Sequence, residues 1–196
     1  SKRITDKTSD KLTHYLRLKS DGIMISSKTL NIDNPKLNCR LEGFNQFSPK
    51  RIILDRNLQI DLKSYIAKSI KNKNTIIFHN SNDKSKIKLL KKRGTTLIKQ
   101  STDKYKNLDL KKILKDLYKM EIRNLLVEGG DILTKNFLQK KLFNEFYMFR
   151  SSKNLSKNKK HVNFTSFSIL NTKYNKHKIN SKLATDKLTI YKNWNV

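Results

Sequence analysis

Short apolar segments alternate with amphipathic helical patterns through most of the chain, and this alternation restricts the possible folds more than any other feature. Five segments have the length and the apolar, isoleucine- and leucine-rich character of buried strands: residues 22–26, 51–55, 75–78, 96–98 and 124–128. Helical patterns of about 10–15 residues stand between several of them, as in units that join parallel strands. The alternation therefore predicts an α/β fold, with a mainly parallel sheet covered by helices on both faces.

Capping residues and apolar stripes mark the helices. Thr5 or Asp6 can cap a helix over residues 6–19, whose inward face is expected to carry Leu12, Tyr15 and Leu16. Asp109 caps the clearest helical pattern of the chain. The apolar stripe of that pattern consists of Leu110, Ile113, Leu114, Leu117 and Met120.

The remaining segments are less regular. A polar loop runs from the first strand to about residue 48, and a helix over residues 83–93 ends at Gly94. A second helix follows Gly129–Gly130 and extends to about residue 141. An aromatic strand is expected over 143–149, and β-hairpins are expected from residue 161 to Leu188–Tyr191. Residues 151–160 are the best candidate for a disordered loop, because Ser, Lys and Asn make up almost all of them.

The net charge of +28 invites a nucleic-acid interpretation. Lysine supplies 36 of the 44 basic residues, and Asn and Ile are also abundant. These amino acids share AT-rich codons and the lysines are spread along the chain, so a low-GC genome explains the composition without a polyanion partner. We expect no specific nucleic-acid partner, and a basic nucleic-acid-binding module stays as the alternative. That module would need a clustered basic face with exposed aromatics, whereas Phe78, Phe137, Phe143 and Phe146 lie in core-like patterns.

Several chemistries are excluded by residues that the chain lacks. Its five glycines form neither the Gly-x-Gly-x-x-Gly of a Rossmann dinucleotide site nor a Walker A loop. Cys39 is the single cysteine, so the paired-cysteine zinc site of deaminases is absent and no metal site is expected. A lone cysteine also suits a reducing cytoplasm. No apolar run approaches the roughly 18 residues of a membrane-spanning helix, so no membrane partner is expected.

One glycine pair stands where a ligand can approach the backbone. A buried strand ends at Glu128, Gly129 and Gly130 follow, and a helix begins at Asp131. Free N–H groups at the start of a helix bind phosphate, and open α/β sheets bind ligands at the carboxyl ends of their strands. The alternative is a tight strand–helix turn in which Asp131 interacts favourably with the helix dipole.

Arginine is scarce, with 8 residues, so the lysine-rich composition does not explain arginines beside polar loops. Arg17 and Arg40 offer planar guanidinium groups suited to phosphate, although each can instead pair with a surface carboxylate. Arg56, which follows Asp55, is either a phosphate ligand or an exposed turn residue. His14 lies on the first helix, where a histidine is more often structural than catalytic.

These segments together resemble one family, the reductase domain of the bifunctional riboflavin-biosynthesis pyrimidine deaminase/reductase. The matching motifs are His-x-x-Arg at residues 14–17, a strand at 21–25, Thr-x-x-x-Asp-Asn-Pro-x-Leu-x-x-Arg at 29–40, a Pro-to-Asp strand at 49–55, and Leu-Val-Glu-Gly-Gly at 126–130. Their order and spacing match from about residue 1 to 149. The resemblance implies a dihydrofolate-reductase-like α/β fold with C-terminal antiparallel strands, in which residues 1–196 form a single reductase domain.

The resemblance also implies NADPH as the hydride donor and 5-amino-6-(5-phosphoribosylamino)uracil as the substrate, reduced to the ribitylamino compound. An NADPH-binding relative with another small substrate is the alternative within the fold. The implied cofactor positions are Thr29, Asp33, Arg56, Gly130, Asp131, Ile132, Leu133 and Thr134. The implied substrate positions are Ser1, Arg17, Leu37, Arg40 and Glu128. Arg17 and Arg40 would bind the ribose phosphate, Arg56 the cofactor 2′-phosphate, and Glu128 or water would supply a proton.

The chain departs from the family pattern in three places. Family members have an upstream strand before the position of Ser1, so we expect a piece of a longer protein, with a deaminase domain in the same native chain. Arg3 stands where an aromatic residue is common, and residues 150–155 replace a turn that contains Pro and Leu-Leu-Gly. The family resemblance further suggests a homodimer, formed through the last strands.

Overall fold

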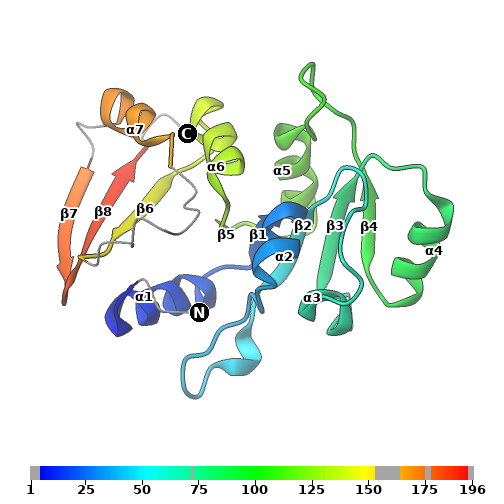
Figure 1. Ribbon diagram of the computed structural model, residues 1–196, viewed down its shortest axis with the longest axis horizontal. Helices are drawn as coiled ribbons and strands as arrows, with labels where there is room; N and C mark the ends of the chain where they lie inside the picture. Colours follow the sequence, from blue (N-terminus) through cyan, green and yellow to red (C-terminus); the bar gives the residue numbers. More distant parts are fainter. Residues whose placement is uncertain (1–4, 72, 153–163, 175–177, 194–196) are drawn as a thin grey trace, which may run out of the picture. The chain divides into compact units, whose positions relative to one another are not determined.

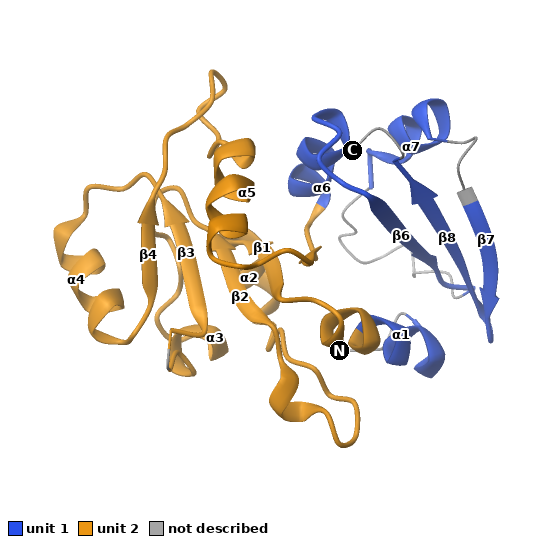
Figure 2. Cartoon of the chain, turned by 180° about the vertical axis from the view of Figure 1, so that it is seen from behind, with its two compact units in different colours: residues 1–13, 131–196 blue, residues 14–130 orange. Residues whose placement is uncertain are grey.

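The computed structural model describes residues 5–71, 73–152, 164–174 and 178–193. Most of the expected disordered loop, residues 153–160, lies outside the described residues, as do Ser1 and Arg3. The chain divides into two compact units (Figure 2): a larger unit, His14–Gly130, and a smaller unit, which combines Ser1–Thr13 with Asp131–Val196. Within the described ranges, no helix has the length and apolar character needed to cross a membrane.

Five parallel strands form the sheet of the larger unit, in the order β4-β3-β2-β1-β5 (Figure 1). They are β1 (Gly22–Ser26), β2 (Lys50–Leu54), β3 (Thr75–His79), β4 (Thr96–Lys99) and β5 (Leu125–Val127). The expected parallel sheet is therefore confirmed. The chain proceeds outward from β1 to β4 and then returns to the other side of β1 as β5. The carboxyl ends of β1 and β5 thus flank the point at which the strand order reverses, where open α/β sheets bind ligands.

Helices pack against both faces of this sheet. On one face, α2 (Ser27–Asp33), α3 (Tyr65–Lys68) and α4 (Lys84–Lys92) join the strands in one core cluster. Its members from the strands and these helices include Ile23, Ile25, Ile53, Ile77, Leu30, Ile66 and Leu90. Side chains alternate along a strand, so the intervening Met24, Ile52 and Ile76 point to the opposite face. Figure 2 shows α5 (Leu110–Lys119) over that opposite face.

The expected caps are present on the long helices. The Asp109 carboxylate accepts the N–H groups of Lys111 and Lys112 at the start of α5. In the smaller unit, the carboxylate of Asp6 accepts the Ser9 N–H at 2.7 Å and starts α1 (Lys7–Leu18). That hydrogen bond is the largest of the causes that lower the pKa of Asp6 to about 2. The expected inward face of α1 is wrong at Tyr15, whose side chain is 47% exposed.

The smaller unit contains an antiparallel sheet in the order β6-β8-β7, which confirms the expected C-terminal antiparallel strands. Its strands are β6 (Glu145–Arg150), β7 (Lys178–Leu183) and β8 (Asp186–Lys192), and its helices after residue 130 are α6 (Asp131–Gln139) and α7 (Phe167–Lys173). The core of this unit consists of Leu138, Leu170, Tyr174 and Tyr191.

Two segments differ from their expected structure. The segment expected to be a polar loop contains α2 and the short 3-10 helix η1 (Asn45–Phe47). The helix α7 precedes the hairpin of β7 and β8, where only hairpins were expected. Both α2 and α7 have 7 residues and bury a single side chain fully, Leu30 or Leu170, so neither carries an apolar period long enough to detect.

Candidate active site

The carboxyl ends of β1 and β5 bring Thr29 and Gly130 together within the larger unit. The Ser26 hydroxyl accepts the Thr29 N–H at 3.2 Å and lies 3.1 Å from the Thr29 hydroxyl, which fixes the first turn of α2. A Cβ atom placed on Gly130 would lie 3.7 Å from the Thr29 Oγ1 atom. Two segments that are distant in the sequence therefore form one exposed edge, where the missing Gly130 side chain leaves room beside a hydroxyl group.

Asp33 extends this edge along α2. It follows Thr29 by four residues, so the two side chains share a face of the helix. Asp33 is exposed and ends α2, and Asn34 follows in the left-handed conformation, with a φ of 44°. Thr29, Asp33 and Gly130, all expected to contact a cofactor, thus belong to one side of the larger unit.

Arg17 and Glu128 form a bidentate ion pair. Arg17 Nε donates to Glu128 Oε1 at 2.8 Å, and Nη2 donates to Oε2 at 2.7 Å. The remaining terminal nitrogen, Nη1, donates to the Asn38 carbonyl at 3.0 Å. The Arg17 and Glu128 side chains are only 12% and 27% exposed. Such paired, charge-assisted hydrogen bonds fix both partners, and an ionised carboxylate can accept hydrogen bonds but not donate them.

The segment from Leu37 to Arg40 is held against the second half of α1. Leu37 has a φ of 51° and is 2% exposed, with its side chain in the core cluster of the larger unit. Its side chain therefore faces the core, and a ligand would meet its main chain. The Arg40 N–H donates to His14 Nδ1 at 3.3 Å, which gives His14 a structural contact. The Arg40 guanidinium is exposed and bonds the neutral Asn38 Oδ1 at 3.3 Å.

Arg56 is exposed at the carboxyl end of β2. Its guanidinium donates to the Asn57 side-chain oxygen at 3.2 Å and to the Lys106 carbonyl, both of which are neutral acceptors. The preceding Asp55 is 1% exposed, and its carboxylate accepts the N–H groups of Gln59 and Ile60 at 2.7 Å each. Asp55 therefore fixes the loop that presents Arg56.

The four remaining candidates lie in the first turn of α6, in the smaller unit. The Asp131 carboxylate accepts hydrogen bonds from both the main chain and the hydroxyl groups of Thr165 and Ser166. The Thr165 hydroxyl is the largest cause of the lowered pKa of Asp131. Leu133 is buried, whereas Ile132 is 66% exposed and Thr134 is half-buried. The side chains of Asp131 and Leu133 are thus engaged inside their own unit.

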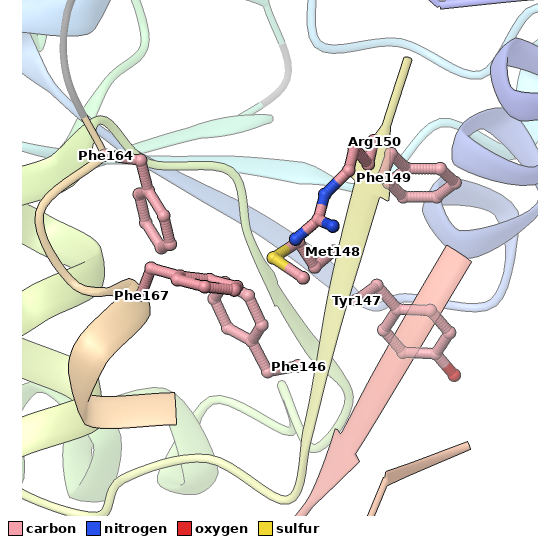
Figure 3. A pocket seen from close by; sticks show the side chains of 7 residues that line it. All are labelled: Phe146, Tyr147, Met148, Phe149, Arg150, Phe164 and Phe167. Atoms are coloured by element: carbon pink, nitrogen blue, oxygen red, sulfur yellow. The ribbon is translucent and has the colours of Figure 1, made fainter. Parts of the chain in front are cut away.

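A separate aromatic pocket of about 530 Å³ lies in the smaller unit (Figure 3). Its lining consists of Phe146, Tyr147, Met148, Phe149, Arg150, Phe164 and Phe167. Phe146 stacks on Phe164 with ring centroids 6.1 Å apart, and the Arg150 guanidinium lies 5.5 Å from the Phe167 ring. None of the residues expected to bind cofactor or substrate lines this pocket.

Sequence reasoning missed two parts of the site. The Asn38 carbonyl, which accepts from Arg17, belongs to the main chain and gives no sequence signal. The loop after β4 places Lys104, Tyr105 and Lys106 near Arg56, through the bond from Arg56 to the Lys106 carbonyl. The flanking Asp103 and Asn107 are typical turn residues and were the available signal for this loop.

Two proteins of Aquifex aeolicus (strain VF5) are similar to this chain in sequence. The riboflavin biosynthesis protein RibD of Aquifex aeolicus (strain VF5) is 31% identical over 153 residues, which are 78% of this chain and 41% of that protein. A 2,5-diamino-6-ribosylamino-4(3H)-pyrimidinone 5′-phosphate reductase of the same organism is 28% identical over 143 residues, which are 72% of this chain and 61% of that protein. The chain thus spans less than two thirds of the length of these curated relatives.

The structure also resembles a solved protein of Thermotoga maritima, described as a diaminohydroxyphosphoribosylaminopyrimidine deaminase/5-amino-6-(5-phosphoribosylamino)uracil reductase. The TM-score is 0.71 at 24% identity, with 98% of this chain and 50% of that one covered. This likeness confirms the expected dihydrofolate-reductase-like α/β fold. A family model described as the RibD C-terminal domain matches residues 1–181. Because that match covers nearly the whole chain, the chain belongs to the RibD C-terminal domain family.

Proposed function

We propose that this chain is an NADPH-dependent oxidoreductase, which reduces 5-amino-6-(5-phosphoribosylamino)uracil to its ribitylamino product in riboflavin biosynthesis. One observation carries the proposal: Thr29 and Gly130 lie side by side where the strand order reverses. Glu128, which forms the ion pair with Arg17, stands two residues before Gly130 in the sequence. Open α/β sheets bind their ligands at this position. The relatives of the chain supply the reaction class, since one of them is named a pyrimidinone 5′-phosphate reductase.

The residues at the carboxyl edge of the sheet fit a phosphorylated dinucleotide. Gly130 has no side chain to block an approach to the Thr29 hydroxyl, and Arg56 presents a cation whose hydrogen bonds go to neutral acceptors. Thr29, Asp33 and Gly130 would hold the cofactor near β1 and β5, and Arg56 would bind its 2′-phosphate. Asp131 to Thr134 would contribute main-chain groups. Bound NADPH supplies the hydride for the reduction.

The substrate would be oriented by the other cluster of candidates. Arg40 has an exposed guanidinium suited to the ribose phosphate, and Leu37 offers its main chain. Ser1 is a further substrate candidate, outside the described residues. Arg17 bonds to Glu128, so we propose that Arg17 acts as a positioning residue that holds this carboxylate toward polar hydrogens of the substrate.

The reaction needs positioning more than a covalent nucleophile. The ring-opened ribosylamine has a carbon–nitrogen double bond at C1′: hydride adds to the carbon, and a proton goes to the nitrogen. Holding donor and acceptor in near-attack geometry supplies much of the rate enhancement. Glu128 accepts two hydrogen bonds from Arg17, an arrangement that favours water over Glu128 as the proton source.

The proposal is tested by titrating the chain with NADPH, followed by fluorescence, and by measuring turnover as the loss of NADPH absorbance. We expect Arg40→Ala to raise KM about tenfold or more, because a charge-assisted phosphate contact is lost, while the Kd for NADPH stays unchanged. A wild-type chain that binds no NADPH would overturn the proposal.

A second candidate substrate has support from a relative. The 28% identical protein of Aquifex aeolicus is named for a 2,5-diamino pyrimidinone phosphate, which has an amino group where the uracil compound has a carbonyl. Comparing kcat/KM for the two compounds decides between them, and we expect the uracil compound to be preferred.

Three accompanying predictions concern the setting of the enzyme. We propose a homodimer, testable by light scattering after size-exclusion chromatography. A deaminase domain in the same native chain is supported by the double description of the Thermotoga maritima protein. The free and buried Cys39 agrees with a reducing cytoplasm as the site of action.

A further inference from the structure

The segment between β4 and α5 forms a small hairpin that rises beyond the carboxyl ends of the strands (Figure 1). A bridge between Thr102 and Leu108 closes it, and we call residues 102–108 the basic hairpin. The Asp103 carboxylate accepts the N–H groups of Tyr105 and Asn107 at 3.0 Å each. The Asp103 N–H donates to the Asn107 carbonyl at 2.7 Å. These hydrogen bonds hold the tip of the basic hairpin in a defined shape.

The tip presents two cations and an aromatic ring. Lys104, Tyr105 and Lys106 are all exposed, and Tyr105 has 70% of its surface accessible. Lys104 Nζ lies 5.1 Å from the centroid of the Tyr105 ring. An exposed ring beside cations is suited to stacking with a nucleobase that carries phosphate.

Arg56 connects the basic hairpin to the loop after β2. Its Nη1 atom donates to the Lys106 carbonyl, and its Nε atom donates to the Asn57 side chain. Because these acceptors are neutral, the guanidinium charge is not compensated through its own hydrogen bonds. Arg56, Lys104 and Lys106 thus form a cationic cluster, and Asp55 and Asp103 fix the two loops that carry it.

We propose that the basic hairpin, together with Arg56, binds the 2′-phosphoadenosine end of the dinucleotide and sets a preference for NADPH over NADH. This inference rests on the proposed function. The three strand spacings from β1 to β4 cover about 15 Å, a distance that an extended dinucleotide can span. With the hydride-donating end of the dinucleotide near β1 and β5, its other end therefore lies above β2 to β4. The lysines and Arg56 would bind the 2′-phosphate, and Tyr105 would stack on the adenine.

The test measures Kd for NADPH and NADH with the whole chain and three variants. Lys104→Gln/Lys106→Gln removes the two ammonium groups of the tip, and Tyr105→Ala removes the ring. Lys111→Gln/Lys115→Gln, on the exposed surface of α5, removes the same net charge elsewhere and serves as the matched control. Competition with 2′,5′-ADP and with 5′-AMP isolates the adenosine half of the ligand.

We expect the tip variant to weaken NADPH binding about tenfold or more, with NADH affected less than about twofold, because only NADPH carries the 2′-phosphate. Tyr105→Ala should weaken both dinucleotides by similar factors, about tenfold, and the α5 control should match the wild type. The same loss should appear for 2′,5′-ADP but not for 5′-AMP.

The remaining outcomes separate the two proposals. If the wild type binds NADPH but the tip variant keeps both affinities, the role of the basic hairpin is refuted while the proposed function stands. Equal losses of NADPH affinity in the tip variant and in the α5 control would show general charge attraction. That result would also refute the role of the basic hairpin. If the wild type binds neither dinucleotide, the proposed function fails and the inference fails with it.

Discussion

The carboxyl edge of the parallel sheet has two ends with opposite arrangements of charge. At the β1–β5 end, Arg17 is paired within the chain, through two charge-assisted bonds to Glu128. At the β2–β4 end, the guanidinium of Arg56 bonds neutral oxygens, one of them the Lys106 carbonyl, and the exposed Lys104 and Lys106 belong to the same basic hairpin. The first arrangement fixes a carboxylate in place, whereas the second keeps cations accessible to an anion.

The two ends of the sheet edge therefore serve different purposes: one positions a carboxylate, and the other provides affinity for phosphate. A compensated pair adds little attraction for a distant anion, but it holds its carboxylate in one orientation. A cluster of exposed cations attracts phosphate and requires no such precision. We therefore expect changes at the β1–β5 end to affect turnover most, and changes at the β2–β4 end to affect binding and its salt dependence.

The largest effect is expected from Glu128→Gln. This change keeps the size of the side chain but removes the charge that Arg17 holds, and we expect kcat/KM to fall roughly a hundredfold through lost positioning. Steady-state kinetics with the pyrimidine substrate measure it. Arg17→Ala should cause a similar loss, seen mainly in kcat, and Arg17→Lys should rescue little because lysine cannot form the bidentate pair.

The double variant Arg17→Ala/Glu128→Gln decides whether the two residues act as one unit. Residues in direct contact have non-additive effects, so the double variant should be no slower than the slower single variant. Losses that multiply would show that the two side chains act independently, and the β1–β5 end would then lose its distinction as a paired site.

The fold was predictable mainly where strands are buried on both faces. β1, β2 and β3 are runs of apolar residues, such as Ile52-Ile53-Leu54, that no solvent-facing position interrupts, so their pattern is unambiguous. α5 was predictable because Asp109 caps it before a clear apolar period, and the end of α4 was predictable from Gly94. The structure adds Asp83 as the residue that caps α4. The short α2 and α7 have no such period, and their helices depend on tertiary contacts of Leu30 and Leu170.

The sequence predicted where several candidate residues lie on the fold, but it did not predict which side chains contact each other. The Leu-Val-Glu-Gly-Gly motif located Glu128 and Gly130 at the end of a strand. A carboxylate partner for Arg17 was one of the two expectations, but Glu128 is 111 residues away in the sequence, so nothing local identified it as that partner. The exposure of Tyr105 depends on the turn that Asp103 stabilises, and the sequence signals that turn but not which side chain it exposes.

A smaller effect is expected from Gly130→Ala, which tests the space beside Thr29. The added Cβ would meet Thr29 Oγ1 at an ordinary 3.7 Å, so the thermal unfolding temperature should stay unchanged. The methyl group would nevertheless occupy the approach of the cofactor, and we expect the Kd for NADPH to rise about tenfold. Fluorescence titration measures this change, and an unchanged Kd would remove Gly130 from the cofactor site.

Gly22→Ala is the matched control for this substitution. At Gly22 a Cβ would lie 2.5 Å from Ile52 Cδ1 and 3.0 Å from Ile122 Cγ2, which forces the core to shift. We expect a loss of about 1–3 kcal/mol in the free energy of unfolding, measured by urea denaturation, with little change in NADPH affinity of the folded protein.

A several-fold effect is expected from salt, and it compares the two ends directly. Exposed cations are screened by salt, whereas half-buried pairs are screened much less. Raising the ionic strength should therefore weaken NADPH binding more than NADH binding, because only NADPH carries the additional phosphate. In Lys104→Gln/Lys106→Gln the two dependences should become nearly parallel. Parallel dependences already in the wild type would contradict an exposed phosphate site at the β2–β4 end.

The smallest effect is expected from acid, through His79 at the carboxyl end of β3. His79 is 3% exposed, and burial is the largest cause that lowers its pKa from the ordinary 6.5. Lys99 and Lys91 act in the same direction, whereas a main-chain hydrogen bond with Ser81 and the charge of Asp55 oppose them. Below pH 6.5 the unfolded chain therefore binds a proton that the folded chain resists, so stability falls as the pH drops toward the folded pKa. Urea midpoints measured from roughly pH 8 to pH 5 should decrease in the wild type.

His79→Gln should flatten that decrease, and amide hydrogen exchange should locate the loss of protection in β3 and β4 rather than in β1 and β5. An equal loss of protection in all five strands would show that acid does not distinguish the two ends of the sheet.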